Sequence, residues 1–294
     1  MALTRIVWGV SLFWLGIGLG AGLLPQIELL APGLSGLFGS DTQDAASTFK
    51  LLISVHTKVL ALVFPTCLVG GLGLSLMAEQ NRTPKAKFTL QAFAYLMLIV
   101  GSAIALADDE AVFRLIPRLL IAITLFSTSI ALILLIFHAR RSVSAGLYLA
   151  AIILPASAYF LLERISSNAN LSATIQDTYY SVAMSHCLAT VIILAIFALL
   201  AVWTKSRDGQ QSLWVTMPHI LAILLASVVY IGNQVSLGVN GIPKRYVDYP
   251  DMFSEVQNRA SIAGFILVAL IIVGFTRFAF AVWRRDRSTP ADQF

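Results

Sequence analysis

Residues 178–203, "TYYSVAMSHCLATVIILAIFALLAVW", decide the fold because this stretch contains no Asp, Glu, Lys or Arg. An apolar helix of about 20 residues crosses the hydrocarbon core of a bilayer. Ionisable side chains are rare inside such helices and mark packing or function when they occur. The stretch therefore predicts a transmembrane helix, and it singles out His186 as a residue whose role needs an explanation.

The rest of the chain has the same character. Its 294 residues are 58% hydrophobic and 12% charged, with a mean hydropathy of +0.83. This composition is far from that of a soluble domain. It predicts an all-α, integral-membrane bundle of about eight transmembrane helices, forming a single domain over residues 1–294. The expected spans are roughly 6–24, 50–78, 88–107, 117–138, 143–162, 178–203, 215–236 and 260–283.

The net charge of +5 reports membrane topology. Basic residues gather in alternate connections, namely at Arg5, 82–87, 140–141, 205–207 and 284–287, whereas the other connections are mostly acidic. By the positive-inside rule, both termini are expected to be cytoplasmic. We therefore expect an integral protein of a bacterial inner membrane, with the lipid bilayer as its surroundings and no nucleic-acid partner.

The chain has four histidines, and two of them are expected to lie at similar membrane depth. His56 follows the outer start of the second expected span by about 9 Å, and His186 follows the outer start of the sixth by about 12 Å. A pair at one level suggests a shared ligand, and neutral imidazole is a good ligand for haem iron. Two other interpretations stay open, which are unrelated core histidines and a proton path.

The other two histidines have simpler interpretations. His138 ends the fourth expected span beside Arg140 and Arg141, and is expected to be interfacial. His219 follows Pro218 near the start of the seventh expected span, where we expect a capping or packing role.

The outer connection 237–259 carries a pair of adjacent cations, Lys244 and Arg245. Haem propionates need positive charge at the interface, and Arg is well shaped to bind a carboxylate. A solvated charge pair is the alternative interpretation.

Four segments resemble subunit I of the haem–copper oxidases, of the cytochrome c oxidase type. They are "SLFWLGIGLGAGLLPQIELLAPG" at 11–33, "SVHTKVLALVFPTCLVGGLG" at 54–73, the "DTYYSVAMSH" helix at 177–203, and "LGVNGIPKRYVDYPDMF" at 237–253. The last two are the most specific, because they resemble the family's Asp-Thr-Tyr-Tyr helix and its Gly-Met-Pro-Arg-Arg-Tyr signature.

The resemblance implies a set of site residues. His56 and His186 would be the axial ligands of one low-spin haem, of b or a type. Lys244 and Arg245 would hold its propionates, and Asp177 would stand where the family has an acid beside them.

The chain also departs from the family. Met184 replaces the histidine that ligates the high-spin haem, and four histidines are too few to include the three copper ligands as well. We therefore expect no copper, and expect the chain not to be a terminal oxidase on its own.

These features predict a membrane cytochrome that transfers electrons through one bis-histidine haem. Its partner would be an outer-face donor or acceptor, such as a cytochrome c or copper domain, or a subunit II-like protein. Two alternatives stay open: a haem-bearing subunit of a larger respiratory oxidoreductase whose catalytic metal lies in a partner, and a haem-binding sensor or assembly factor.

Overall fold

The computed structural model describes residues 2–30, 42–80, 83–106, 142–167, 178–208, 212–243 and 251–288. Within these ranges the secondary structure is helical, apart from a single bridge between Thr178 and Pro243. The chain divides into two compact units, Met1–Phe137 and His138–Phe294. Each unit is described by itself below.

The first unit contains α1 (Ala2–Leu30), a long helix from Thr42 to Gln80, and α4 (Pro84–Leu106). Its core is formed by apolar side chains that lose all contact with solvent, such as Val7, Val63 and Leu72. Burial of one such side chain stabilises a fold by about 1.5–3 kcal/mol in water, but lipid is as apolar as the side chain, so packing and polar contacts matter more here. One polar contact joins α1 to α4, where Trp14 Nε1 donates a hydrogen bond to Ser102 Oγ at 3.1 Å.

The helix from Thr42 to Gln80 is continuous but not uniform. It consists of α2 (Thr42–Lys58), the π-helical segments η1 (Val59–Val63) and η2 (Thr66–Gly70), and α3 (Gly71–Gln80). Pro65 lies between the two π-helical segments and has no N–H to donate to the preceding turn. The chain widens around it, and the N–H of Phe64 donates to Val59 O, five residues back. Single π-helical turns of this kind often occur near functional residues.

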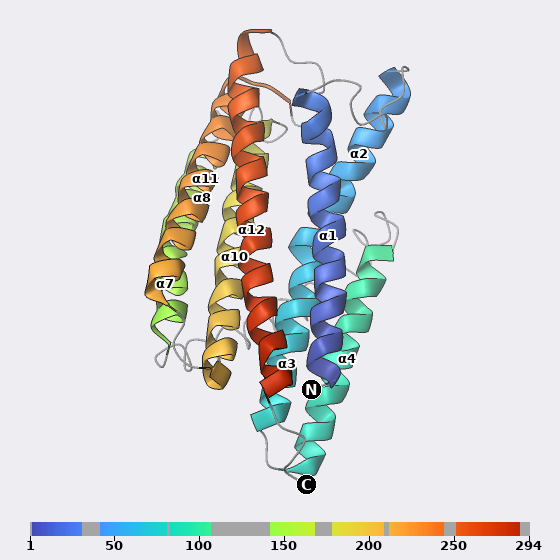
Figure 1. The fold of residues 1–294 in the computed structure, drawn as a ribbon. Helices are drawn as coiled ribbons and strands as arrows, with labels where there is room; N and C mark the ends of the chain where they lie inside the picture. Colours follow the sequence, from blue (N-terminus) through green and yellow to red (C-terminus); the bar gives the residue numbers. More distant parts are fainter. Residues whose placement is uncertain are drawn as a thin grey trace. The chain divides into compact units, whose positions relative to one another are not determined.

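The second unit contains α7 (Val143–Ala151), α8 (Ile153–Ser166), α10 (Tyr179–Asp208), α11 (Leu213–Val239), η3 (Asp251–Phe253) and α12 (Ser254–Ser288). The helix α10 contacts α7, α8, α11 and α12, and is therefore the centre of this unit. In Figure 1, α7 and α8 follow one another along one line, α10 and α11 run beside them, and α12 runs beside α10 and α11.

The break between α7 and α8 has a local cause. Pro155 cannot donate to the carbonyl four residues before it, and the N–H of Ile152 turns to Leu149 O at 3.2 Å. Helical bonding resumes at once, since Ala156 N–H donates to Ile152 O at 3.0 Å. The two helices therefore form one membrane span with a single irregular turn at Ile152.

Six helices of the described chain are long and apolar enough to cross a membrane: Arg5–Glu28, Pro84–Ala105, Val143–Ser166, Tyr179–Val202, Leu213–Val239 and Ser254–Phe280. The expected all-α membrane fold is thus confirmed, but the count of eight spans is not. The expected span 50–78 is helical throughout. Within it, only the shorter stretch Thr66–Ser75 is apolar enough to be compared with the six long helices. The expected span 117–138 lies outside the described residues, and the single domain over 1–294 stays a prediction.

Candidate functional site

His56 is fixed by the neighbouring helix of its own unit. Its Nδ1 lies 2.8 Å from the main-chain oxygen of Gly18 in α1. A carbonyl oxygen only accepts hydrogen bonds, so Nδ1 of the neutral ring carries the proton and donates it. The lone pair is then on Nε2, which is the arrangement that metal-ligating histidines commonly have.

Two glycines of α1 make room for the helix that carries His56, and one of them for its ring. A Cβ at Gly22 would overlap the imidazole, and a Cβ at Gly18 would lie 2.6 Å from Leu60 Cδ2 and 3.0 Å from Val59 Cγ1. Gly18 and Gly22 are four residues apart and lie on one side of α1, as in the small-residue pattern that lets membrane helices approach closely. The close approach brings the Gly18 carbonyl within reach of the ring.

His186 has the same protonation pattern, obtained within its own helix. Its Nδ1 lies 2.9 Å from the main-chain oxygen of Val182, one turn earlier in α10. The proton is therefore on Nδ1 and the lone pair on Nε2.

Tyr230 of α11 lies against the Nε2 side of the His186 ring. Its hydroxyl is 3.4 Å from Nε2, and the two rings meet edge to face with centroids 4.8 Å apart. Tyr230 is 7% exposed. This contact gives His186 a hydrogen-bond partner at Nε2. Such a partner is expected of a core histidine, so the contact favours that interpretation over a haem ligand unless iron replaces the hydroxyl.

His219 differs from both. Its Nε2 donates to Leu270 O at 3.0 Å, and its Nδ1 accepts from the Tyr148 hydroxyl at 2.8 Å. The ring also packs edge to face against Phe197, which is fully buried. Its lone pair is therefore used inside the unit, which agrees with the packing role expected from the sequence. His138 lies outside the described residues.

The residues expected beside the haem propionates, Asp177, Lys244 and Arg245, also lie outside the described residues. The residues next to them in the sequence are described, and they are joined by main-chain hydrogen bonding. Thr178 and Pro243 form an antiparallel bridge, and Tyr179 N–H donates to Ile242 O at 3.1 Å. The two segments from which these residues extend therefore begin at the same end of the second unit.

The close approach of these segments depends on Gly238 at the end of α11. A Cβ there would overlap the main chain of Tyr180 at the start of α10. The Tyr180 hydroxyl reaches the opposite way and donates to Leu162 O in α8 at 2.8 Å. The start of α10 is thus held from both sides.

Met184 packs against a buried cluster of Leu162, Tyr180 and Cys187. It therefore packs within the second unit.

The described residues contain no group of three or more His, Cys, Asp or Glu side chains that could together hold a metal ion. A haem held by two imidazoles needs no such group. His56 belongs to the first unit and His186 to the second, so each has been described within its own unit.

Some contacts of these histidines were not predicted from the sequence. The Gly18–Gly22 spacing is a readable signal, because glycines four residues apart mark a close helix contact. Tyr230 carries no such signal, because a contact between two helices leaves no local pattern in either.

Comparison with known proteins gives a partial similarity to one family. The chain is 29% identical over 107 residues to cytochrome c oxidase subunit 1 of Cereibacter sphaeroides, a match that covers 36% of this chain and 19% of that protein. It is 29% identical over 116 residues to cytochrome c oxidase subunit 1 of Albinaria turrita, covering 37% of this chain and 58% of that protein. No protein-family model matches the chain.

These matches agree with the resemblance inferred from the motifs, at the level of a distant relationship over about a third of the chain. The six long apolar helices and this similarity together identify an integral membrane protein. Each matched segment is less than two thirds of its relative's length, so the activity of those proteins is not carried over as a finding.

Proposed function

We propose that the protein is a membrane cytochrome that carries one low-spin haem and passes single electrons, with His56 and His186 as the axial ligands. The observation that supports it best is shared by both histidines: each ring donates Nδ1–H to a main-chain carbonyl, so Nε2 is the nitrogen that iron would bind, at His186 in place of the Tyr230 hydroxyl. The distant similarity to cytochrome c oxidase subunit 1 is a second, independent support.

The donor set fits the group. Iron binds the neutral imidazole, and a hydrogen bond at the second ring nitrogen fixes the ring's orientation and makes the ligand more basic. The Gly18 and Val182 carbonyls do this for the two rings. When bound, haem supplies a one-electron Fe(III)/Fe(II) couple whose potential depends on its axial ligands, burial and nearby charge.

The remaining residues would neutralise the haem propionates and limit the access of water to the iron. Lys244 and Arg245 would bind the propionate carboxylates, with Asp177 close to them, at the end of the unit where Thr178 and Pro243 pair. The apolar side chains of α10 and α11 would keep water from the iron. A bound electron donor or acceptor, such as a cytochrome c or copper domain, would dock at this end.

The proposal includes the loss of oxygen chemistry. With His56 and His186 assigned to one iron, two of the four histidines remain, and His219 uses both ring nitrogens inside its unit. Met184 occupies the position where the family has the high-spin haem ligand. We therefore propose that the chain descends from an oxidase subunit and no longer carries the haem–copper centre.

Spectroscopy of the purified full-length protein tests this proposal. We expect one haem per chain in the pyridine haemochrome count, no copper, and the low-spin EPR signal of a bis-imidazole haem. The variants His56→Ala and His186→Ala should each abolish the low-spin signal, because one axial ligand is lost, whereas His219→Gln should keep it. A purified protein without haem, or with a high-spin haem that binds CO, would contradict the proposal.

The variant Tyr230→Phe separates the two interpretations of His186. If His186 ligates iron, Nε2 is bound to the metal and the Tyr230 hydroxyl makes no bond to it, so the variant keeps the low-spin signal and also the wild-type melting temperature. If His186 is a core histidine, the variant loses a hydrogen bond of about 1 kcal/mol and affects no haem property. The readouts are the haem count and the apparent melting temperature, measured together in one detergent.

A further inference from the structure

An arginine lies inside the last apolar span of the second unit. Arg277 is three residues from the end of the span Ser254–Phe280, which places it about 4.5 Å from that end along the helix axis. Thr216 lies equally close to the start of α11. The two residues therefore meet at one membrane surface, at the end where α11 begins and α12 ends.

The Arg277 guanidinium is held in place where α11 and α12 pack together, a contact called the α11–α12 seam below. Its Nη2 donates to Thr216 Oγ1 at 3.3 Å, and its Cζ lies 5.8 Å from the centre of the Phe278 ring. Thr216 is fully buried, and its hydroxyl lies 3.2 Å from Ser212 O and 3.4 Å from Ser144 Oγ. Arg277 is thus directed at α11 by a buried polar chain, unlike a surface arginine that extends into water.

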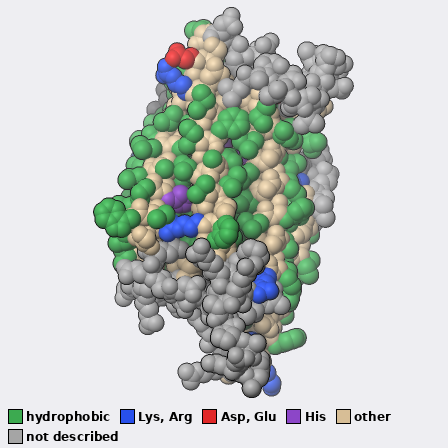
Figure 2. Space-filling view, in the orientation of Figure 1, with side chains coloured by type: hydrophobic (Ala, Val, Ile, Leu, Met, Phe, Trp, Pro, Cys, Tyr) green, Lys and Arg blue, Asp and Glu red, His purple; other side chains and the backbone are tan. Residues whose placement is uncertain are grey.

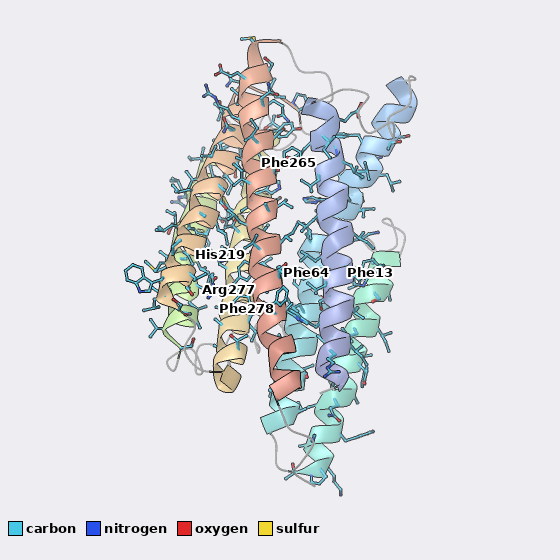
Figure 3. All side chains as sticks on the ribbon, viewed as in Figure 1. Phe13, Phe64, His219, Phe265, Arg277 and Phe278 are labelled. Atoms are coloured by element: carbon cyan, nitrogen blue, oxygen red, sulfur yellow. The ribbon has the colours of Figure 1, made fainter. Side chains whose placement is uncertain are left out.

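Figure 3 places Arg277, Phe278 and His219 close together beside α12. In the same orientation, Figure 2 shows a basic and a histidine side chain next to one another on a face that is otherwise largely hydrophobic. His219 is not a free donor here, because both ring nitrogens bond within the unit. The guanidinium is the group that gives this spot its charge.

The surroundings have the character of a lipid–water interface. Exposed apolar side chains lie within about one turn of Thr216 or Arg277 along the two helices, and they are Trp214, Met217, Val273 and Phe280. Trp214 is 90% exposed, and tryptophan is enriched at the headgroup level of membranes. The seam therefore presents a fixed cation beside side chains that face acyl chains.

The helix continues with more positive charge. Beyond Arg277, α12 extends to Ser288 and includes Arg284, Arg285 and Arg287 against a single Asp286. Basic clusters next to a transmembrane helix attract anionic lipids, and basic pockets between helices bind their head groups.

We propose that the α11–α12 seam binds the phosphate group of an anionic phospholipid, with Arg277 as the binding residue and Thr216 as the residue that positions it. A guanidinium fits phosphate through two parallel N–H donors, which a lysine ammonium cannot offer in the same geometry. This site is separate from the proposed haem site and does not depend on it.

The test measures lipid retention by the full-length protein. The protein is reconstituted in nanodiscs of phosphatidylglycerol and phosphatidylcholine, released gently, and analysed by native mass spectrometry for bound lipid. We expect retained phosphatidylglycerol, and we expect Arg277→Gln to weaken its affinity about tenfold, because a charged hydrogen-bonding partner is lost. Arg277→Lys should give an intermediate loss, because it keeps the charge and loses the fork.

Arg259→Gln is the matched control. Arg259 lies on the same helix near its other end, is exposed, and pairs with Glu255. Its variant should leave retention unchanged. Equal retention by Arg277→Gln and the wild type, or an equal loss in Arg259→Gln, would overturn the proposal.

Two further arms keep the result interpretable. Thr216→Val preserves the shape and the charge of Arg277, and should weaken retention several-fold if Thr216 orients the guanidinium; full retention in this variant would remove it from the site. Inorganic phosphate should displace no more lipid than chloride at equal ionic strength. Specific displacement by phosphate would assign the site to a free anion and overturn the lipid assignment.

Discussion

At the scale of single residues, the placement of one proton decides what each imidazole can do. His56 and His186 donate from Nδ1 to a main-chain oxygen, whereas His219 donates from Nε2. The donor at His56 reaches Gly18 because α1 carries no side chain at Gly18 or Gly22 to keep the helices apart. The protonation of His56 therefore depends on two glycines in another helix.

The variant Gly22→Ala tests this dependence. The new methyl group would overlap the His56 ring, so either the ring or the helix must move. We expect a loss of about 1–3 kcal/mol from overpacking, together with a changed low-spin EPR signal if His56 ligates iron.

Gly20→Ala serves as its control, because a Cβ at Gly20 meets nothing within 4 Å. This variant should be neutral, or more stable by about 0.5–1 kcal/mol, because alanine favours the helix. Apparent melting temperatures and haem spectra of the two variants should therefore diverge. The same behaviour in both would contradict the described contact of α1 with His56.

The sequence alone identifies the two histidines but not the groups that they contact. Depth along the expected spans singled out His56 and His186, since an apolar run with one histidine is easy to read. The partners of the rings were not predicted, because the Gly18 carbonyl and the Tyr230 hydroxyl come from other helices. Whether the two histidines share a ligand stays a prediction.

At the scale of helices, the apolar runs predicted the spans but not their details. The described helices extend beyond the runs, as α12 does from Ser254 to Ser288, because backbone hydrogen bonding continues past the apolar part. The π-helical turns beside Pro65 were also missed. One extra residue in a turn leaves the apolar pattern nearly unchanged, so hydropathy cannot detect it.

The contact of α10 with α11 gives a prediction of its own. In Gly238→Ala the new methyl group would overlap the main chain of Tyr180, and a backbone cannot turn aside as a side chain can. We expect a loss of about 2–3 kcal/mol, seen as a lower apparent melting temperature in detergent.

Gly232→Ala on the same helix is the matched comparison, because its Cβ would meet nothing within 4 Å. It should unfold at or above the wild-type temperature. A melting temperature for Gly238→Ala equal to that of Gly232→Ala would argue against the close approach of α10 and α11.

At the scale of the whole molecule, the distribution of basic residues predicts an orientation in the membrane. Within the second unit, the bridge of Thr178 with Pro243 and the end of α12 lie at opposite ends of the helices, because α12 runs a full span away from the bridge. The cluster from Arg284 to Arg287 should then be cytoplasmic and the bridge external.

Reporter fusions test this orientation. Alkaline phosphatase fused after Asn240 should be active, because this exposed residue lies beside the bridge. Alkaline phosphatase should be inactive, and green fluorescent protein fluorescent, when fused at either terminus. An active phosphatase at the C-terminus would reverse the assignment.

The bridge of Thr178 with Pro243 also gives the molecule a built-in reporter. The Tyr179 amide, at the first residue of α10, donates to Ile242 O and so joins two segments that are distant in the sequence. Its deuterium uptake therefore measures how often the segment after α11 separates from the start of α10. A protein that docks on this end should slow that uptake while leaving amides in the middle of α10 unchanged, so hydrogen exchange at this one residue would detect the docking of the proposed partner.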